Sequence, residues 1–211
     1  PYIGGFNGWG GLIYTLAHLG ALWQRPDLWG KALTFAEVAA THIQQDEQFD
    51  VIGGAAGCIG AVAALYICTM DPRLPALIAQ CADHLVAHAQ PLATGVGWVV
   101  PNMGGAPLAG FSHGAAGIAW ALLKAADICN NPVYRDVAQQ ALAYERSLFA
   151  AGADNWADLR SSTEDTKPTD QPAAAMHAWC HGAPGIGLAR LAMLEQMDDA
   201  QVRDEIAIAL H

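Results

Sequence analysis

Apolar residues recur at helical spacing along most of the chain, in two kinds of segment. The first kind, near 27–45, 74–85 and 133–148, places apolar side chains three or four positions apart with polar residues between them. This spacing predicts helices with one buried face. Asp71-Pro72 and Asn131-Pro132 precede two of these segments, and each pair predicts a capping residue followed by a proline at the first helical position.

The second kind of segment is apolar on nearly every side and follows a Gly-x-x-Gly motif. Four such motifs have their second glycines at positions 11, 57, 117 and 185, which are spaced by 46, 60 and 68 residues. Repeats at this spacing fit helical hairpins joined by loops of varying length. We therefore expect inner helices, buried on all sides, near 8–20, 54–69, 114–129 and 182–196.

Inner helices that alternate with outer amphipathic helices predict an all-α fold. We expect residues 1–211 to form one partial domain of about four consecutive helical hairpins, as an incomplete α/α toroid. An open α-solenoid is the alternative, but it usually leaves one face of each inner helix in water. Strand alternation is convincing only in the short stretch 97–100. Two long polar loops, 91–110 and 152–178, lead into inner helices, and loops of this length are usually functional or disordered.

Composition and charge narrow the range of functions. The chain is 53% hydrophobic and 14% charged, against about 25% charged residues in typical soluble domains. Its net charge is −10 and it has no basic cluster, which disfavours nucleic acids and anionic membranes as partners. No apolar stretch reaches the roughly 18 residues that a membrane-spanning helix needs. Four of the five cysteines lie in apolar helical segments, which is typical of buried thiols in a reducing, cytoplasmic compartment.

Candidate chemical residues stand at or near the starts of the inner helices. They are Asp50, His113, Cys180 and His181. If the starts of these helices converge at one mouth of a toroid, the four side chains could share a pocket. A cysteine thiolate binds zinc well, and zinc lowers the pKa of a bound thiol or water. A histidine can transfer a proton near neutral pH, and a carboxylate can orient it.

Each of these residues also has a purely structural interpretation. Cys180 could be a structural thiol in a turn, Asp50 a helix cap, and the two histidines capping or hydrogen-bonded residues. No short Cys/His pair has the spacing of a self-contained zinc site, so spacing alone leaves the choice open.

Two motifs resemble the LanC-like family of lanthionine synthetase cyclases. They are Gly-Phe-Ser-His-Gly-Ala-Ala-Gly-Ile at 110–118 and Trp-Cys-His-Gly-Ala-Pro-Gly-Ile-Gly-Leu-Ala-Arg at 179–190. The Trp-Cys-His-Gly form looks most like the C-terminal cyclase domain of the class II, LanM-type synthetases. Residues 5–14 and 49–57 resemble the preceding units of that domain.

This resemblance implies a zinc-dependent enzyme that closes thioether rings in lantibiotic biosynthesis. In the family, a peptide cysteine adds to dehydroalanine or dehydrobutyrine in a Michael-type reaction, within a toroid of about seven hairpins. Cys180 takes the place of one zinc ligand, and His181 is a weaker candidate for a ligand. The resemblance implies one zinc ion per complete domain. His113 takes the place of the active-site histidine, and Asp50 that of the aspartate.

The chain departs from the family pattern at two positions. The Cys-His pair of the next repeat has no counterpart, because His211 follows no cysteine. The remaining ligands are therefore expected beyond residue 211, and this chain alone is expected to be inactive. Some cyclases have an arginine four positions before the zinc cysteine, where this chain has Met176.

The partners that the resemblance implies are a bacterial precursor peptide, with a leader and a dehydrated core, and an N-terminal dehydratase domain. Nothing in this chain resembles that dehydratase domain. Two alternatives remain. One is a non-catalytic module, LanC-like or solenoid, that binds peptides or thiols. The other is a different toroid enzyme, a glycosidase or terpene cyclase, although only Asp50 is a carboxylate at a helix mouth and Asp198-Asp199 lacks a further aspartate.

Overall fold

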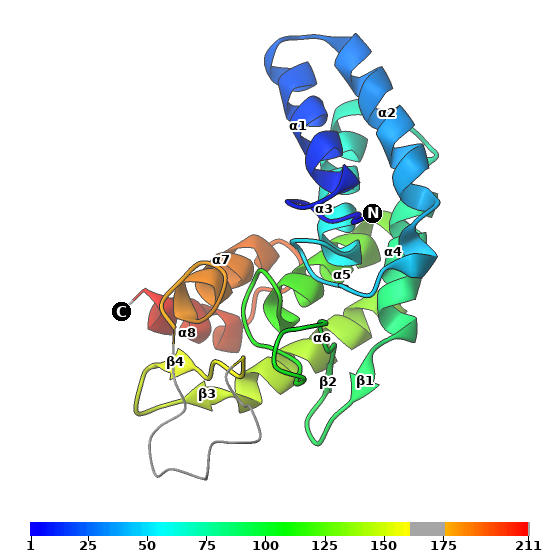
Figure 1. The fold of residues 1–211 in the computed structure, drawn as a ribbon. Coiled ribbons are helices and arrows are strands. Elements are labelled where there is room, and N and C mark those ends of the chain that lie inside the picture. Colours follow the sequence, from blue (N-terminus) through cyan, green and yellow to red (C-terminus); the bar gives the residue numbers. More distant parts are fainter. Residues whose placement is uncertain (161–175, 211) are drawn as a thin grey trace. The chain divides into compact units, whose positions relative to one another are not determined.

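A computed structural model describes residues 1–160 and 176–210, and these residues are mostly helical. The predicted all-α fold class is confirmed (Figure 1). The chain divides into two compact units. The first unit comprises Pro1–His88 and Ala121–Arg135, and the second comprises Ala89–Trp120 and Asp136–His211. The long loop expected over 152–178 is described only at its two ends, and His211 lies outside the described residues.

Helical hairpins build the first unit. Its elements are α1 (Trp9–Leu22), α2 (Pro26–Ala40), the short 3-10 helix η1 (Ile43–Gln45), α3 (Ala55–Thr69) and α4 (Leu74–Ala87). Helix α1 packs against α2 and α3, and α3 also packs against α4. The antiparallel pair of α1 and α2 is seen clearly in Figure 1. The C-terminal part of α5 (Ala115–Cys129) completes this unit.

The second unit contains the start of α5 and most of α6 (Pro132–Ser147). Helix α7 (Ala183–Met193) packs against α8 (Ala200–Ala209). Two small antiparallel hairpins complete the unit: β1 (Gln90–Pro91) pairs with β2 (Val96–Gly97), and β3 (Phe149–Ala150) pairs with β4 (Asn155–Trp156). The strand expected over 97–100 is thus limited to Val96 and Gly97.

The two expected helix starts at Asp-Pro and Asn-Pro have different outcomes. The start at Asn131-Pro132 is confirmed: α6 begins at Pro132, and Asn131 Oδ1 accepts a hydrogen bond from the Val133 amide at 3.1 Å. The start at Pro72 is wrong, since α4 begins at Leu74. The carboxylate of Asp71 accepts from the Arg73 amide at 3.0 Å, so it stabilises a turn before the helix rather than the helix itself. The outer helix expected over 27–45 is divided into α2 and η1.

Burial on every side occurs in the middle inner helices but not in α1 and α7. Helices α3 and α5 bury small apolar residues around most of their circumference. In contrast, Leu12 and Tyr14 of α1 and Leu188 and Leu191 of α7 are exposed. These four side chains are 46–57% exposed.

The inner helices α3, α5 and α7 are capped by side chains from distant positions. Helices α3 and α7 follow glycines, which offer no capping side chain. Instead, the Ala55 amide of α3 donates to the Asp46 side chain at 2.8 Å, and the Ala183 amide of α7 donates to the Asn155 side chain at 2.8 Å. In the same way, the Ala116 amide in the first turn of α5 donates to Glu145 at 3.1 Å. These acceptors satisfy N–H groups that a helix cannot satisfy internally.

We expect the Asp46→Ala substitution to destabilise the first unit. The buried Asp46 carboxylate accepts hydrogen bonds from the amides of Gln48, Phe49 and Ala55, so its removal leaves these donors, including the buried Ala55 amide, without this partner. The expected loss is about 2 kcal/mol in the free energy of unfolding, measured by urea denaturation. The control is Glu37→Ala, which removes an exposed ion pair with Arg73 and is expected to have little effect. Equal losses in the two variants would contradict this account.

Candidate functional site

Two loops of the second unit lie directly against each other. The loop before α5 carries His113, and the loop before α7 carries Cys180 and His181. The hydroxyl of Ser112 donates to the Cys180 carbonyl oxygen at 3.1 Å, and the Ser112 amide approaches the same oxygen at 3.3 Å. The imidazole rings of His113 and His181 are stacked, with centroids 5.7 Å apart. The structure therefore brings three of the four predicted residues into one region.

Glycine is required where these loops touch. Gly110 has a φ of 108°, and a Cβ atom there would lie 2.8 Å from the Cys180 carbonyl oxygen and 3.1 Å from the His181 Cα. Gly182 has a φ of 89°, and its Cβ would lie 1.7 Å from the Met176 carbonyl oxygen. Any larger residue would be strained at both positions. At Gly110 it would also push the two loops apart, and at Gly182 it would distort the loop before α7.

The thiol of Cys180 is free and half-buried. The other four cysteines belong to the first unit, and two of them, Cys58 and Cys81, are fully buried. Cys180 also lies just before the N-terminus of α7, where the helix dipole favours negative charge. Cys180 is thus the thiol that accompanies the two histidines of this site.

The His181 side chain is buried and its pKa is lowered. Burial is the main cause, and the positive charge of Arg160 adds to it, while Asp158 opposes the shift. A hydrogen bond with the backbone of Ala109 also opposes it. We therefore expect His181 to be mainly neutral at pH 7.

Arg160 and Asp158 are parts of this region that sequence reasoning missed. The Arg160 guanidinium makes a two-pronged contact with the Asp158 carboxylate, from Nε at 2.9 Å and from Nη2 at 2.6 Å. Its Nη2 also lies 2.9 Å from the sulfur of Met176. The pKa of Arg160 is raised, first by its hydrogen bond to Asp158 and in smaller part by Cys180. The Arg160 guanidinium thus contacts Met176, which stands at the position where some cyclases of the resembled family have an arginine.

We expect the Arg160→Gln substitution to raise the pKa of His181. The guanidinium charge disfavours a second positive charge on the imidazole, so its removal favours protonation. An NMR titration of the His181 ring in metal-free protein would measure the shift. The control is Arg203→Gln, which removes an exposed guanidinium that binds Asp198 on α8. A His181 pKa that stays constant or falls in Arg160→Gln would contradict the prediction.

Asp50 belongs to the first unit and shapes the turn before α3. It is 1% exposed, and its Oδ1 accepts from the Gly53 amide at 2.7 Å. Its carbonyl oxygen accepts from the amides of Gly54 and Gly57. These contacts match the structural interpretation of Asp50, and its grouping with His113 stays a prediction.

Comparison with known proteins identifies the family. The model of the family described as "Lanthionine synthetase C-like protein" matches residues 1–211. The chain belongs to this family. A solved structure of nisin cyclase matches this LanC-like chain with a TM-score of 0.67 and 17% sequence identity, over 99% of this chain and 57% of that one. At this identity the likeness shows a shared LanC-like fold. The LanC-like chain thus spans a little more than half the length of nisin cyclase, and no curated protein sequence matches it.

The donors in this LanC-like site have the right chemistry for zinc but are an incomplete set. One thiol and two imidazoles offer soft sulfur and nitrogen ligands, which zinc prefers. Among residues 1–160 and 176–210, however, no group of three His, Cys, Asp or Glu side chains is arranged to hold a metal ion. The same residues include no helix long and apolar enough to span a bilayer.

Proposed function

We propose that this LanC-like chain contributes to a cyclase site that forms thioether rings in lanthipeptides. The observation that supports this most directly is the contact between the His113 loop and the Cys180 loop. The loop with His113, an imidazole that can move a proton, thus contacts the loop with Cys180, a thiol that can bind a metal. The family match to lanthionine synthetase C-like proteins points to the same chemistry.

The proposed reaction is a Michael-type addition. The sulfur of a substrate cysteine forms a bond to the β-carbon of dehydroalanine or dehydrobutyrine, and the C=C π bond breaks. The thiol loses its proton and the α-carbon gains one, so no oxidant or reductant is needed. The reaction therefore requires a group that favours thiolate and a group that delivers a proton to the enolate.

His113 is the proposed proton donor to the α-carbon. It is half-buried, so a peptide can reach it, and its stacked neighbour His181 is expected to be neutral and does not add a second charge. Asp50 is the proposed assisting carboxylate.

Zinc is the proposed cofactor, with Cys180 as one ligand and the remaining ligands outside the described residues. When bound, it would lower the pKa of a substrate thiol and so supply the thiolate. His181 is a second candidate ligand. Its hydrogen bond with the Ala109 backbone engages the ring and would fix the ring orientation in that role.

The proposed substrate is a bacterial precursor peptide with a leader and a dehydrated core. The proposed setting is a cytoplasmic, LanM-type protein that also contains a dehydratase domain. The net charge of −10 is compatible with a cationic peptide.

A non-catalytic peptide- or thiol-binding module is the second candidate function. It is favoured by one observation, the lack of a three-ligand group among the described residues. Both candidates predict peptide binding, but only the cyclase predicts loss of free substrate thiols.

The deciding experiment incubates the full-length protein with zinc and a dehydrated precursor peptide. Ring closure does not change the mass of the peptide, so the remaining thiols are alkylated and then counted by mass spectrometry. A cyclase leaves few thiols to alkylate and contains stoichiometric zinc. Complete alkylation together with absence of zinc would favour the binding module instead.

A further inference from the structure

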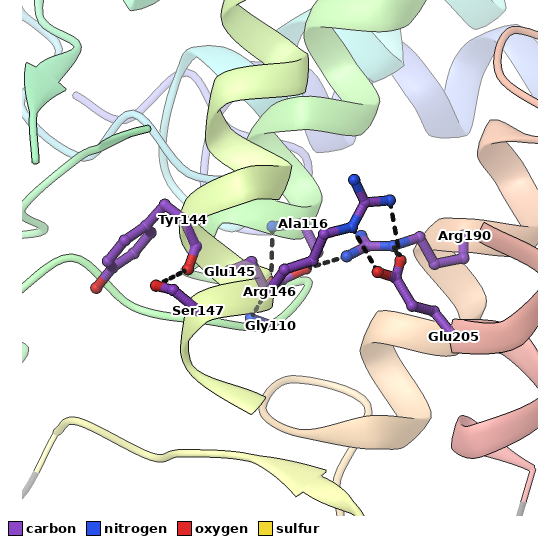
Figure 2. A network of polar contacts seen from close by, with 8 residues as sticks. All are labelled: Gly110, Ala116, Tyr144, Glu145, Arg146, Ser147, Arg190 and Glu205. Atoms are coloured by element: carbon purple, nitrogen blue, oxygen red, sulfur yellow. Dashed lines mark hydrogen bonds and ion pairs between the residues drawn. The ribbon is translucent and has the colours of Figure 1, made fainter. Parts of the chain in front are cut away.

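A buried network of ionised side chains ties three helices of the second unit together. Glu145 of α6 and Arg190 of α7 are fully buried, and Glu205 of α8 is 6% exposed. Arg190 donates from Nη2 to Glu145 at 2.8 Å and from Nε to Glu205 at 2.5 Å. Figure 2 shows the Arg190 guanidinium between the two carboxylates. Arg146 binds Glu205 from the more exposed side.

The other oxygen of Glu145 holds the loop that carries His113. Glu145 Oε1 accepts from the Gly110 amide at 2.8 Å and from the Ala116 amide at 3.1 Å (Figure 2). These two amides stand three positions before and three positions after His113. One oxygen atom therefore fixes both ends of loop 110–116.

Fold stability alone is a weak reason for such a network. Removing ionised groups from water is so unfavourable that apolar replacement of a buried charged triad is often neutral or stabilising. A carboxylate is nevertheless suited to this place, because it accepts from two amides and a guanidinium and has no donor of its own. A neutral glutamine would turn an N–H group toward Arg190. The charge of Arg190 then compensates the carboxylate that the loop requires.

The same network reaches both loops of the candidate site. Ser112, inside the held loop, donates to the Cys180 carbonyl, and Arg190 is on the helix that follows Cys180. A shift of loop 110–116 would therefore move His113 relative to Cys180.

We propose that Glu145 is a positioning residue for His113, and that Arg190, itself paired with Glu205, compensates the charge of its carboxylate. This inference rests on the proposed cyclase function, because its activity readout is ring closure. Its structural readout, the protection of the Gly110 and Ala116 amides against hydrogen exchange, does not depend on that function.

The test compares two triple variants of the full-length protein. Both contain Arg190→Met and Glu205→Leu, which remove the charges around Glu145. One variant also contains Glu145→Gln, which keeps an acceptor oxygen for the two amides, and the other contains Glu145→Leu, which removes it. We expect kcat of the Leu variant to fall roughly 100-fold, because a displacement of a reacting group by about 1 Å can have an effect of this size. The change in KM should be smaller. The Gly110 and Ala116 amides of this variant should lose protection. The Gln variant should keep most of the kcat and the protection.

Equal activity in the two variants would overturn the proposal, and so would equal losses, since the acceptor oxygen would then not decide the rate. Should the Leu variant not fold, Glu145→Asp in the otherwise wild-type protein replaces it. This variant keeps the charge but withdraws the oxygens by about one C–C bond, near 1.5 Å. We expect it to fold, with lower kcat and weaker amide protection, and wild-type values for both would overturn the proposal. Failure of the cyclase function itself is distinguishable, because the wild-type protein would then close no rings.

Discussion

The Cys180→Ala variant of the full-length protein is expected to lose ring closure by at least about 100-fold, since even the outer partners of metal ligands account for 10- to 100-fold effects. Cys180 is the free thiol of the loop that carries His181 and contacts the His113 loop, and its replacement removes the proposed zinc ligand. Zinc content should fall together with activity. Alkylation of unreacted substrate thiols and metal analysis measure the two effects on the same sample.

The matched control for this variant is Cys129→Ala. Cys129 is also a free, half-buried cysteine, but it belongs to the first unit and contacts the Pro75 carbonyl oxygen. We expect Cys129→Ala to retain zinc and ring closure. Full ring closure by Cys180→Ala with wild-type zinc content would remove Cys180 from the site.

His113→Asn has the second-largest expected effect, and it should separate catalysis from metal binding. Loss of a positioned acid or base typically lowers the rate by about 10²- to 10⁴-fold, so kcat should fall within that range. Zinc content should stay at the wild-type level, because the proposed role of His113 is proton transfer. Asparagine keeps a polar side chain of similar size, which limits disturbance of the loop against Cys180.

His42→Asn is the control for the His113 variant. His42 is half-buried in the first unit, and its Nδ1 lies 3.4 Å from Gln45 Oε1. We expect this variant to cyclise the peptide at the wild-type rate. A His113→Asn protein with unchanged kcat would show that another group delivers the proton.

Local sequence signals predicted some features of the fold well. The apolar spacing after Pro132 and the cap at Asn131 act over a few residues, and α6 begins where they predict. The cap expected at Asp71 was wrong because an aspartate before a proline suits a turn as well as a helix start. Such short-range competition cannot be resolved from the pattern alone.

The distant caps could not be predicted, because they depend on the folded arrangement. Asp46, Glu145 and Asn155 lie 9, 29 and 28 residues from the helix amides that they accept from. The glycines that precede α3 and α7 have no side chain that could cap these helices, so the sequence indicated only that other residues must do so. Arg160 likewise reaches Met176 across 16 residues, and a lone arginine in a long loop has no pattern that would reveal this.

The candidate site was predictable in part because its residues stand at equivalent positions of a repeat. His113 and His181 each stand directly before the first glycine of a Gly-x-x-Gly motif, and their rings are stacked with centroids 5.7 Å apart. The repeat pattern could not reveal that Glu145 holds the His113 loop, since Glu145 lies in an outer helix.

The most direct test of one shared site is the ring-closure rate of the double variant Cys180→Ala/His113→Asn beside the two single variants. Residues that act together in one reaction show strongly non-additive losses. We predict that the double variant will be scarcely slower than the worse single variant. Losses that multiply in full, or a double variant that still closes rings at the wild-type rate, would contradict a common role for these two side chains.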